Sequence, residues 1–286
     1  MKKLSLVFAF TLLLCSCKKI EVPTATLPNN TSEKLTVSST SSQQPIKPAI
    51  PTLKQIEDKY NGMKPTEWGE NITGVISRIK TRKKTLFLTF DACGSDDANG
   101  FGNGYDRNLI DYLTQEKIPA TLFINHRWIK NNQSVFKELA KNPLFNIENH
   151  GEQHRPLSVT GRSVYEITGT KSPKEAYEEI EKNNIAIKKV TGKRPSFFRA
   201  GTAYYDDVAI KIATDLGMKI AGYNVLGDAG ATLSAPQILQ NCTDPLNGSI
   251  LLFHMNRPAS ETYLGIKQLI PILKNQNYKF SVLEAE

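Results

Sequence analysis

Residues 85–94 read Thr-Leu-Phe-Leu-Thr-Phe-Asp-Ala-Cys-Gly, and the architecture of the chain can be worked out from this stretch. Its first six residues form an apolar run of strand length. The run ends on Asp91, whose charge needs a polar partner or a metal ion because an isolated charge is costly to bury. The pattern is typical of a strand that delivers a functional carboxylate at its end.

Short apolar runs alternate with longer amphipathic ones from Thr85 onward. The strand-like runs are 85–90, 120–124, 145–148, 196–198, 219–225, 249–253 and 279–283. The helical patterns are near 105–117, 134–141, 173–191, 205–216, 235–241 and 262–275. This α/β alternation predicts a parallel sheet, and seven strands favour an irregular (β/α)7-type barrel over a doubly wound sheet.

Polar residues follow the predicted strands at the point where each one ends. They are Asp91, His150, Arg199, Asp228 and His254. Because α/β barrels build their active sites at the carboxyl ends of their strands, these residues are expected to share one site. No G-x-G-x-x-G or P-loop pattern points to a nucleotide.

Two predicted residue pairs suggest acid–base chemistry at this site. Asp91 paired with Arg199 would stay ionised and oriented as a general base. His254 is a candidate general acid, with Asp228 to orient it. For each of these residues the alternative is a simple ion pair at the barrel mouth.

His150 and His154 are four residues apart and can face one ion, for which imidazole is a good ligand. The zinc peptidase patterns place Glu next to a histidine, whereas this chain has Gly151 and Gln153 there, so a peptidase is disfavoured.

With these residues identified, the chain resembles the polysaccharide deacetylases of carbohydrate esterase family 4, the NodB-homology domain, from about residue 85 to residue 283. The family motifs T-F-D-D-G, H-[ST]-x-x-H, R-x-P-[YF], an Asp/Trp segment and L-x-H correspond in order to segments that begin at Thr89, His150, Arg199, Tyr223 and Leu252. The resemblance implies a NodB-like barrel that hydrolyses N-acetyl groups of amino sugars in peptidoglycan or a surface glycan.

The resemblance also implies residue roles and a divalent metal cofactor, with zinc as first choice. By position, Asp91 matches the catalytic base, Arg199 its partner, Asp228 the residue that tunes the catalytic histidine, His254 the acid, and His150 and His154 the metal ligands. Leu252 would line the acetyl pocket. Tyr204 and Tyr205 are expected to bind substrate.

The departures from the family pattern leave several points open. Ala92 replaces the family's second Asp, a metal ligand, so the third ligand could be Asp91 or Cys93, with Asp96, Asp97 and Asp106 as further choices. The missing tryptophan leaves its packing role to Tyr223 or Val225. Residues 155–170 either cap the pocket or form a structural insertion.

The N-terminal residues predict export. Residues 1–16 resemble a lipoprotein signal peptide that leaves Cys17 lipidated, 17–55 form a Ser/Thr/Pro-rich tether, and 56–286 form the catalytic domain. The expected location is the bacterial cell envelope, with the protein anchored to a membrane through its lipid.

Composition limits the partners. The net charge is +8, but the one dense basic block, 78–84, has no interleaved aromatic residues, so no nucleic acid is expected. A disulfide between Cys93 and Cys242 stays open, as does the oligomeric state. Two other functions remain: a metal-independent hydrolase of small cyclic amides, and a catalytically silent glycan-binding lipoprotein, which would not need both Asp91 and His254.

Overall fold

The computed structural model describes residues 49–97, 99–100 and 102–284. The predicted signal peptide, the Cys17 lipidation site and most of the tether lie outside the described residues. The first described helix, α1 (Leu53–Tyr60), begins three residues before the predicted start of the catalytic domain. No helix in the described part of the chain is long and apolar enough to cross a membrane.

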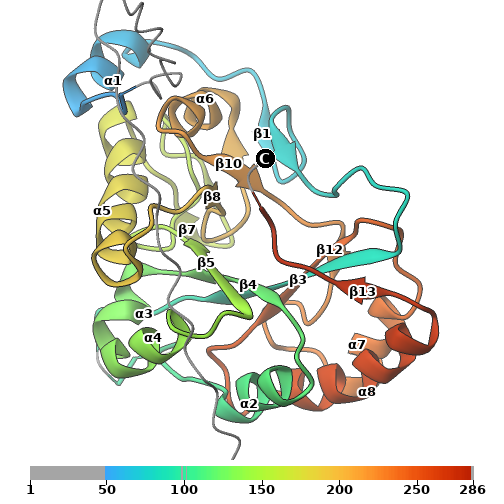
Figure 1. Cartoon of the computed structure of the whole chain (residues 1–286). Coiled ribbons are helices and arrows are strands. Elements are labelled where there is room, and N and C mark those ends of the chain that lie inside the picture. The colour runs from blue at the N-terminus through green and yellow to red at the C-terminus, as the bar shows by residue number, and fades with distance from the viewer. Residues whose placement is uncertain (1–48, 98, 101, 285–286) are drawn as a thin grey trace, which may run out of the picture. The chain divides into compact units, whose positions relative to one another are not determined.

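A curled sheet of nine strands forms the centre of the molecule (Figure 1). Its strands, in spatial order, are β11 (Val225–Leu226), β12 (Ile250–His254), β3 (Thr85–Ala92), β4 (Ala120–Ile124), β5 (Phe145–Asn149), β8 (Phe197–Phe198), β10 (Lys219–Ala221) and β2 (Val75–Ile76), with β13 (Lys279–Phe280) beside β3. Every pairing in this sheet is parallel. The predicted α/β barrel architecture is therefore confirmed.

Helices lie around the outside of the sheet (Figure 1). Besides α1 they are α2 (Arg107–Gln115), α3 (His126–Asn131), α4 (Gln133–Leu139), α5 (Pro173–Thr191), α6 (Asp207–Asp215), α7 (Ala235–Cys242) and α8 (Thr262–Asn275). Two short antiparallel pairs complete the structure: β1 (Trp68–Gly69) with β9 (Tyr205–Asp206), and the hairpin of β6 (Ser163–Val164) and β7 (Ile167–Thr168).

Strand β3 shows how the sequence separates the inside of the barrel from the outside. Successive side chains of a strand point to opposite faces, so alternate residues share one environment. Leu86, Leu88, Phe90 and Ala92 pack in the core under the outer helices. Phe87 lies in a separate apolar cluster with Phe123, Phe197, Ala221, Ile250 and Leu283. Asp91, the last residue but one of β3, therefore lies on the inner face.

The predicted strand 219–225 is wrong as a single element. It is broken into β10 and β11, which lie at opposite sides of the strand order. The residues between them cross from one side to the other: Gly222 N donates to Ile76 O, and Asn224 N donates to Ile250 O. No strand pairing joins β2 to β11, the two ends of the strand order, in the described residues. The connection between β10 and β11 therefore spans the gap between these two edges.

Candidate active site

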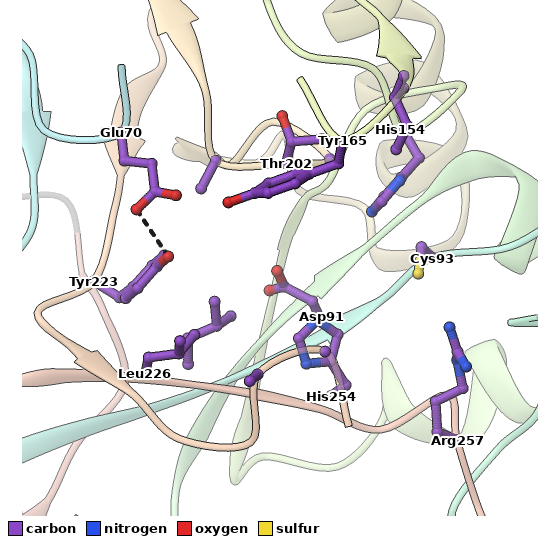
Figure 2. A pocket seen from close by; sticks show the side chains of 16 residues that line it. Glu70, Asp91, Cys93, His154, Tyr165, Thr202, Tyr223, Leu226, His254 and Arg257 are labelled. Carbon is purple, nitrogen blue, oxygen red and sulfur yellow. Dashed lines mark hydrogen bonds between the residues drawn. The ribbon is translucent and has the colours of Figure 1, made fainter. Parts of the chain in front are cut away.

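Strand register brings two of the predicted catalytic residues together. His254 of β12 lies opposite Asp91 of β3, so both side chains leave the sheet on the same side at its carboxyl end. They line a cavity of about 430 Å³ together with Cys93, His154 and Leu252. Figure 2 shows Asp91 and His254 at the centre of this cavity.

Asp91 and Arg199 form the predicted ion pair at the base of the cavity. Arg199 is fully buried, and its Nη1 donates to Asp91 Oδ1 at 2.7 Å. Its other donors bond Thr89 Oγ1 at 3.0 Å, Ala221 O at 3.2 Å and Gly222 O at 2.9 Å. Burial alone would raise the pKa of Asp91, but the Arg199 guanidinium outweighs burial and lowers it. Asp91 is therefore an ionised, fixed carboxylate.

His254 is held by Asp228. The His254 Nδ1 atom lies 2.8 Å from Asp228 Oδ1, and the other Asp228 oxygen accepts from His254 N and from Thr262 Oγ1, each at 2.8 Å. Burial disfavours the imidazolium, but the adjacent Asp228 carboxylate overcomes this effect and raises the pKa of His254 to about 9. The ring is thus protonated at neutral pH, as a general acid must be.

The rings of His150 and His154 lie 5.0 Å apart. His150 Nδ1 is 2.9 Å from Arg199 O, which can only accept, so Nδ1 carries the proton and Nε2 is bare. This Nε2 is buried without a hydrogen-bond partner among the described residues and lies 3.6 Å from Asp91 Oδ2. Burial lowers the pKa of both histidines to about 4, so both are neutral, as metal ligands must be.

Two glycines and a buried carboxylate shape the loop that carries the histidines. Gly151 has φ +80°, and a Cβ there would lie 2.3 Å from Glu179 Oε1. Glu179, on α5, accepts the backbone N–H of Gln153 at 3.0 Å. A Cβ on Gly201 would lie 2.4 Å from the backbone carbon of His154. The loop conformation therefore depends on the lack of a side chain at both glycines.

Comparison with known proteins agrees with this geometry. The polysaccharide deacetylase family model matches residues 78–221, half of the chain. The chain belongs to the polysaccharide deacetylase family. It is a hydrolase of the class that acts on the amide C–N bonds of acetylated sugars.

Individual relatives are distant. The peptidoglycan-N-acetylmuramic acid deacetylase PdaA of Bacillus subtilis is 22% identical over 235 residues, covering 77% of this chain and 80% of that protein. The peptidoglycan-N-acetylglucosamine deacetylase of Bacillus cereus is 23% identical, covering 73% and 91%. A carbohydrate esterase family 4 pseudoenzyme from Bacillus anthracis has the same fold, with a TM-score of 0.61, 22% identity, and coverage of 75% and 69%.

Among the residues that the structure describes, no side chain near the two histidines stands out as a third ligand for a metal ion. Ala92 is fully buried in the apolar core outside the barrel. Cys93 lines the cavity, and its Sγ accepts from Asn256 Nδ2 at 3.2 Å. The other predicted alternatives have partners elsewhere: Asp96 pairs with Arg127, Asp97 accepts from Asn99 N, and Asp106 caps α2.

The two histidines nevertheless fit two positions around a divalent ion. Both are neutral, and the bare Nε2 of His150 lies 3.6 Å from Asp91 Oδ2. A cation between these two atoms would satisfy both of them. The described residues contain no group of three His, Cys, Asp or Glu side chains placed to hold a metal ion.

The residues predicted to bind substrate lie in different places. Leu252 lines the cavity, as expected. Tyr204 stands behind the cavity wall, with its ring 5.9 Å from that of Tyr165. Tyr205 does not line the cavity: it is fully buried in the core against α6, and its hydroxyl accepts from Ala200 N at 3.1 Å. The structure therefore gives Tyr205 a packing position in the core instead of a place at the cavity.

Several cavity residues were not found from the sequence. Glu70, Ile167, Thr202, Leu226 and Arg257 line the cavity from loops and short strands. Only Ile167 had a signal in the sequence, which was the length of the 155–170 segment. Tyr165 and Ile167 from that segment line the cavity, so it contributes to the wall of the site, whereas Tyr223 lines the cavity from the crossing between β10 and β11. Cys93 and Cys242 are free thiols.

Proposed function

We propose that this protein is a metal-dependent deacetylase that removes N-acetyl groups from amino sugars of peptidoglycan or a surface glycan. The observation that carries the proposal is the pairing of two opposite protonation states in one cavity. Asp91 is ionised beside Arg199, while His254 is protonated beside Asp228. Groups whose environments push their pKa values apart are suited to act as a base and an acid in one reaction.

The reaction needs one proton removed and one delivered. The acetyl group would lie against Leu252, within reach of both Asp91 and His254. Asp91 accepts a proton as a water oxygen bonds to the acetyl carbon, and His254 gives its proton to the departing nitrogen as the C–N bond breaks. The products are acetate and the free amine. A divalent ion held by His150 and His154 supplies polarisation of the acetyl carbonyl and a more acidic water.

We infer that the enzyme works in the cell envelope, anchored by a lipid on Cys17. The signal-like residues 1–16 support this location. Peptidoglycan, the polymer named for two relatives, is an exported substrate that an envelope protein would meet.

One observation favours a second function, a metal-independent hydrolase of small cyclic amides. The Ala92 side chain points into the apolar core, so the family's usual carboxylate ligand is lost at that position. Asp91, Arg199 and His254 would still supply a base and an acid for amide hydrolysis.

Elemental analysis and acetate release separate these functions. The domain 49–286, purified without chelators and then soaked with zinc, is expected to hold near-stoichiometric metal and to release acetate from N-acetylglucosamine oligomers. The His150→Ala/His154→Ala variant is expected to lose the metal. Asp91→Asn is the matched variant that should keep folding but lose acetate release. Full metal content in the histidine variant would contradict the ligand assignment, and amide hydrolysis without metal would favour the second function.

A further inference from the structure

The β6–β7 hairpin places an aromatic side chain at the cavity in an unusual backbone conformation. Tyr165 and Glu166 occupy its two-residue turn with φ +50° and +63°. Left-handed backbone is uncommon for a bulky residue such as Tyr. Tyr165 lines the cavity although 68% of its surface is exposed. Such strain is often found at ligand-binding positions.

Tyr165 stands at the end of a row of three aromatic rings. Its ring lies 5.9 Å from that of Tyr204, edge to face, and Tyr204 lies 5.7 Å from Trp68. The Arg162 guanidinium stands 4.9 Å over the Trp68 ring. The row joins three segments that are distant in sequence, and it fixes Tyr165 while leaving much of its surface open.

A carboxylate stands beside the Tyr165 hydroxyl. Glu70 lines the cavity, and its Oε2 accepts from the Tyr223 hydroxyl at 3.0 Å. Figure 2 shows the Glu70 carboxylate and the Tyr165 hydroxyl pointing toward each other, on the side of the cavity away from Arg257. Burial and the neighbouring Tyr204 and Glu70 raise the pKa of Tyr165, so its hydroxyl stays protonated. The cavity thus has an acidic end at Glu70, while His254 is cationic.

We propose that Tyr165 and Glu70 form a sugar subsite that selects an uncharged N-acetylated pyranose. This proposal rests on the proposed function and names the substrate of the same site. The apolar face of the sugar ring stacks on Tyr165, and a ring hydroxyl donates to Glu70. A sugar that carries a carboxylate at this position, such as N-acetylmuramic acid, is repelled by Glu70, since rejection by like charge is a common source of specificity. N-acetylglucosamine is therefore the preferred ring.

The test uses the whole chain with oligomers of N-acetylglucosamine and with matched oligomers that contain N-acetylmuramic acid. Tyr165→Ala is expected to raise KM and the calorimetric Kd for N-acetylglucosamine oligomers about tenfold, the loss typical of an aromatic anchor, with kcat little changed. Tyr165→Phe keeps the stacking ring and loses only the hydroxyl, so its KM and Kd are expected to rise less than those of Tyr165→Ala. Glu70→Gln is expected to reduce the preference for N-acetylglucosamine in kcat/KM about tenfold.

Ile185, an exposed residue of α5, provides the control, and Ile185→Ala is expected to change neither quantity. An unchanged KM and Kd in Tyr165→Ala, or an unchanged sugar preference in Glu70→Gln, would overturn the subsite. Oligomer binding that weakens in Tyr165→Ala without acetate release from any glycan would support the subsite and contradict the proposed function. Acetate release with a normal KM in Tyr165→Ala would support the proposed function and contradict the subsite. Absence of both binding and acetate release would overturn both.

Discussion

Arg199 shows at the scale of one residue how function and stability are linked. It is a fully buried cation whose donors all point to fixed oxygens, and Asp91 is the one carboxylate among them. Arg199→Met is expected to lower the free energy of unfolding by about 3–5 kcal/mol, because it leaves a buried carboxylate without its counter-charge. Urea unfolding measures this loss, and acetate release is expected to vanish with it.

The double variant Asp91→Asn/Arg199→Met is the control for this prediction. With both charges removed, the free energy of unfolding is expected to recover most of the loss while acetate release stays absent. A double variant as unstable as Arg199→Met alone would show that Arg199 stabilises the fold through its backbone carbonyl partners instead.

The protonation of His254 is expected to set the alkaline limb of the pH dependence of kcat/KM. Its pKa is raised to about 9, and the reaction needs the protonated ring, so kcat/KM should fall as pH rises through about 9. In Asp228→Asn the main effect that raises the pKa of His254 is lost while burial still lowers it, so the pKa falls and the alkaline limb moves to lower pH. The pH dependence of kcat/KM for both proteins is the measurement.

Thr262→Val serves as the matched variant for the pH profile. It removes one hydrogen bond to Asp228 but keeps the Asp228 charge, so its alkaline limb should stay near that of wild type. An alkaline limb that is the same in wild type and Asp228→Asn would rule out His254 as the group that titrates.

The site residues at strand ends were the ones that the sequence predicted best. Asp91, His150, Arg199 and His254 each follow a strand-like run, and parallel strands bring their carboxyl ends to one edge. Glu70 and Tyr165 gave no such signal, because they reach the cavity from a loop and a two-residue turn. Their positions depend on tertiary contacts such as the Glu70–Tyr223 hydrogen bond.

At the scale of elements, the loop that carries the histidines depends on close approach to the turn after β8. Gly201→Ala would place a Cβ 2.4 Å from the His154 backbone, so the histidine must move. We expect this variant to lose metal uptake in elemental analysis while remaining folded. Gly192→Ala is the comparison: Gly192 has φ +73° and no neighbour within 4 Å, so it should cost about 1 kcal/mol of stability and leave metal uptake unchanged. Normal metal uptake in Gly201→Ala would contradict the expected displacement.

Elements with a strong periodic pattern were predicted well. The predicted helix at 173–191 coincides with α5, which has Ser172 as its N-cap and Gly192 in left-handed conformation at its end. The prediction of one strand at 219–225 was wrong because the apolar pattern continues through the residues that connect β10 to β11. There Arg199 binds the carbonyls of Ala221 and Gly222, and the chain leaves one side of the sheet for the other.

At the scale of the whole molecule, α1 decides where the domain begins. The sequence alone placed the boundary at residue 56, because the preceding residues are rich in Ser, Thr and Pro. The structure instead has Thr52 as the N-cap of α1, and it buries Ile56 and Tyr60 in the same core cluster as residues of α5 and α6. Tyr60 also donates its hydroxyl to Asp215 at 2.9 Å. The helix is thus part of the folded domain.

A domain that starts at residue 49 should therefore unfold with the same free energy as the full chain, whereas one that starts at residue 61 should be clearly less stable. Within the longer domain, Ile56→Ala removes a fully buried side chain and is expected to cost about 2–5 kcal/mol in urea unfolding. Lys54→Ala is the control on the same helix, since Lys54 is exposed and its ion pair with Asp58 contributes little. Equal stability of the domains that start at 49 and 61 would mean that α1 is only an extension of the tether. A loss in the shorter domain would mean that the barrel needs α1 to cover α5 and α6.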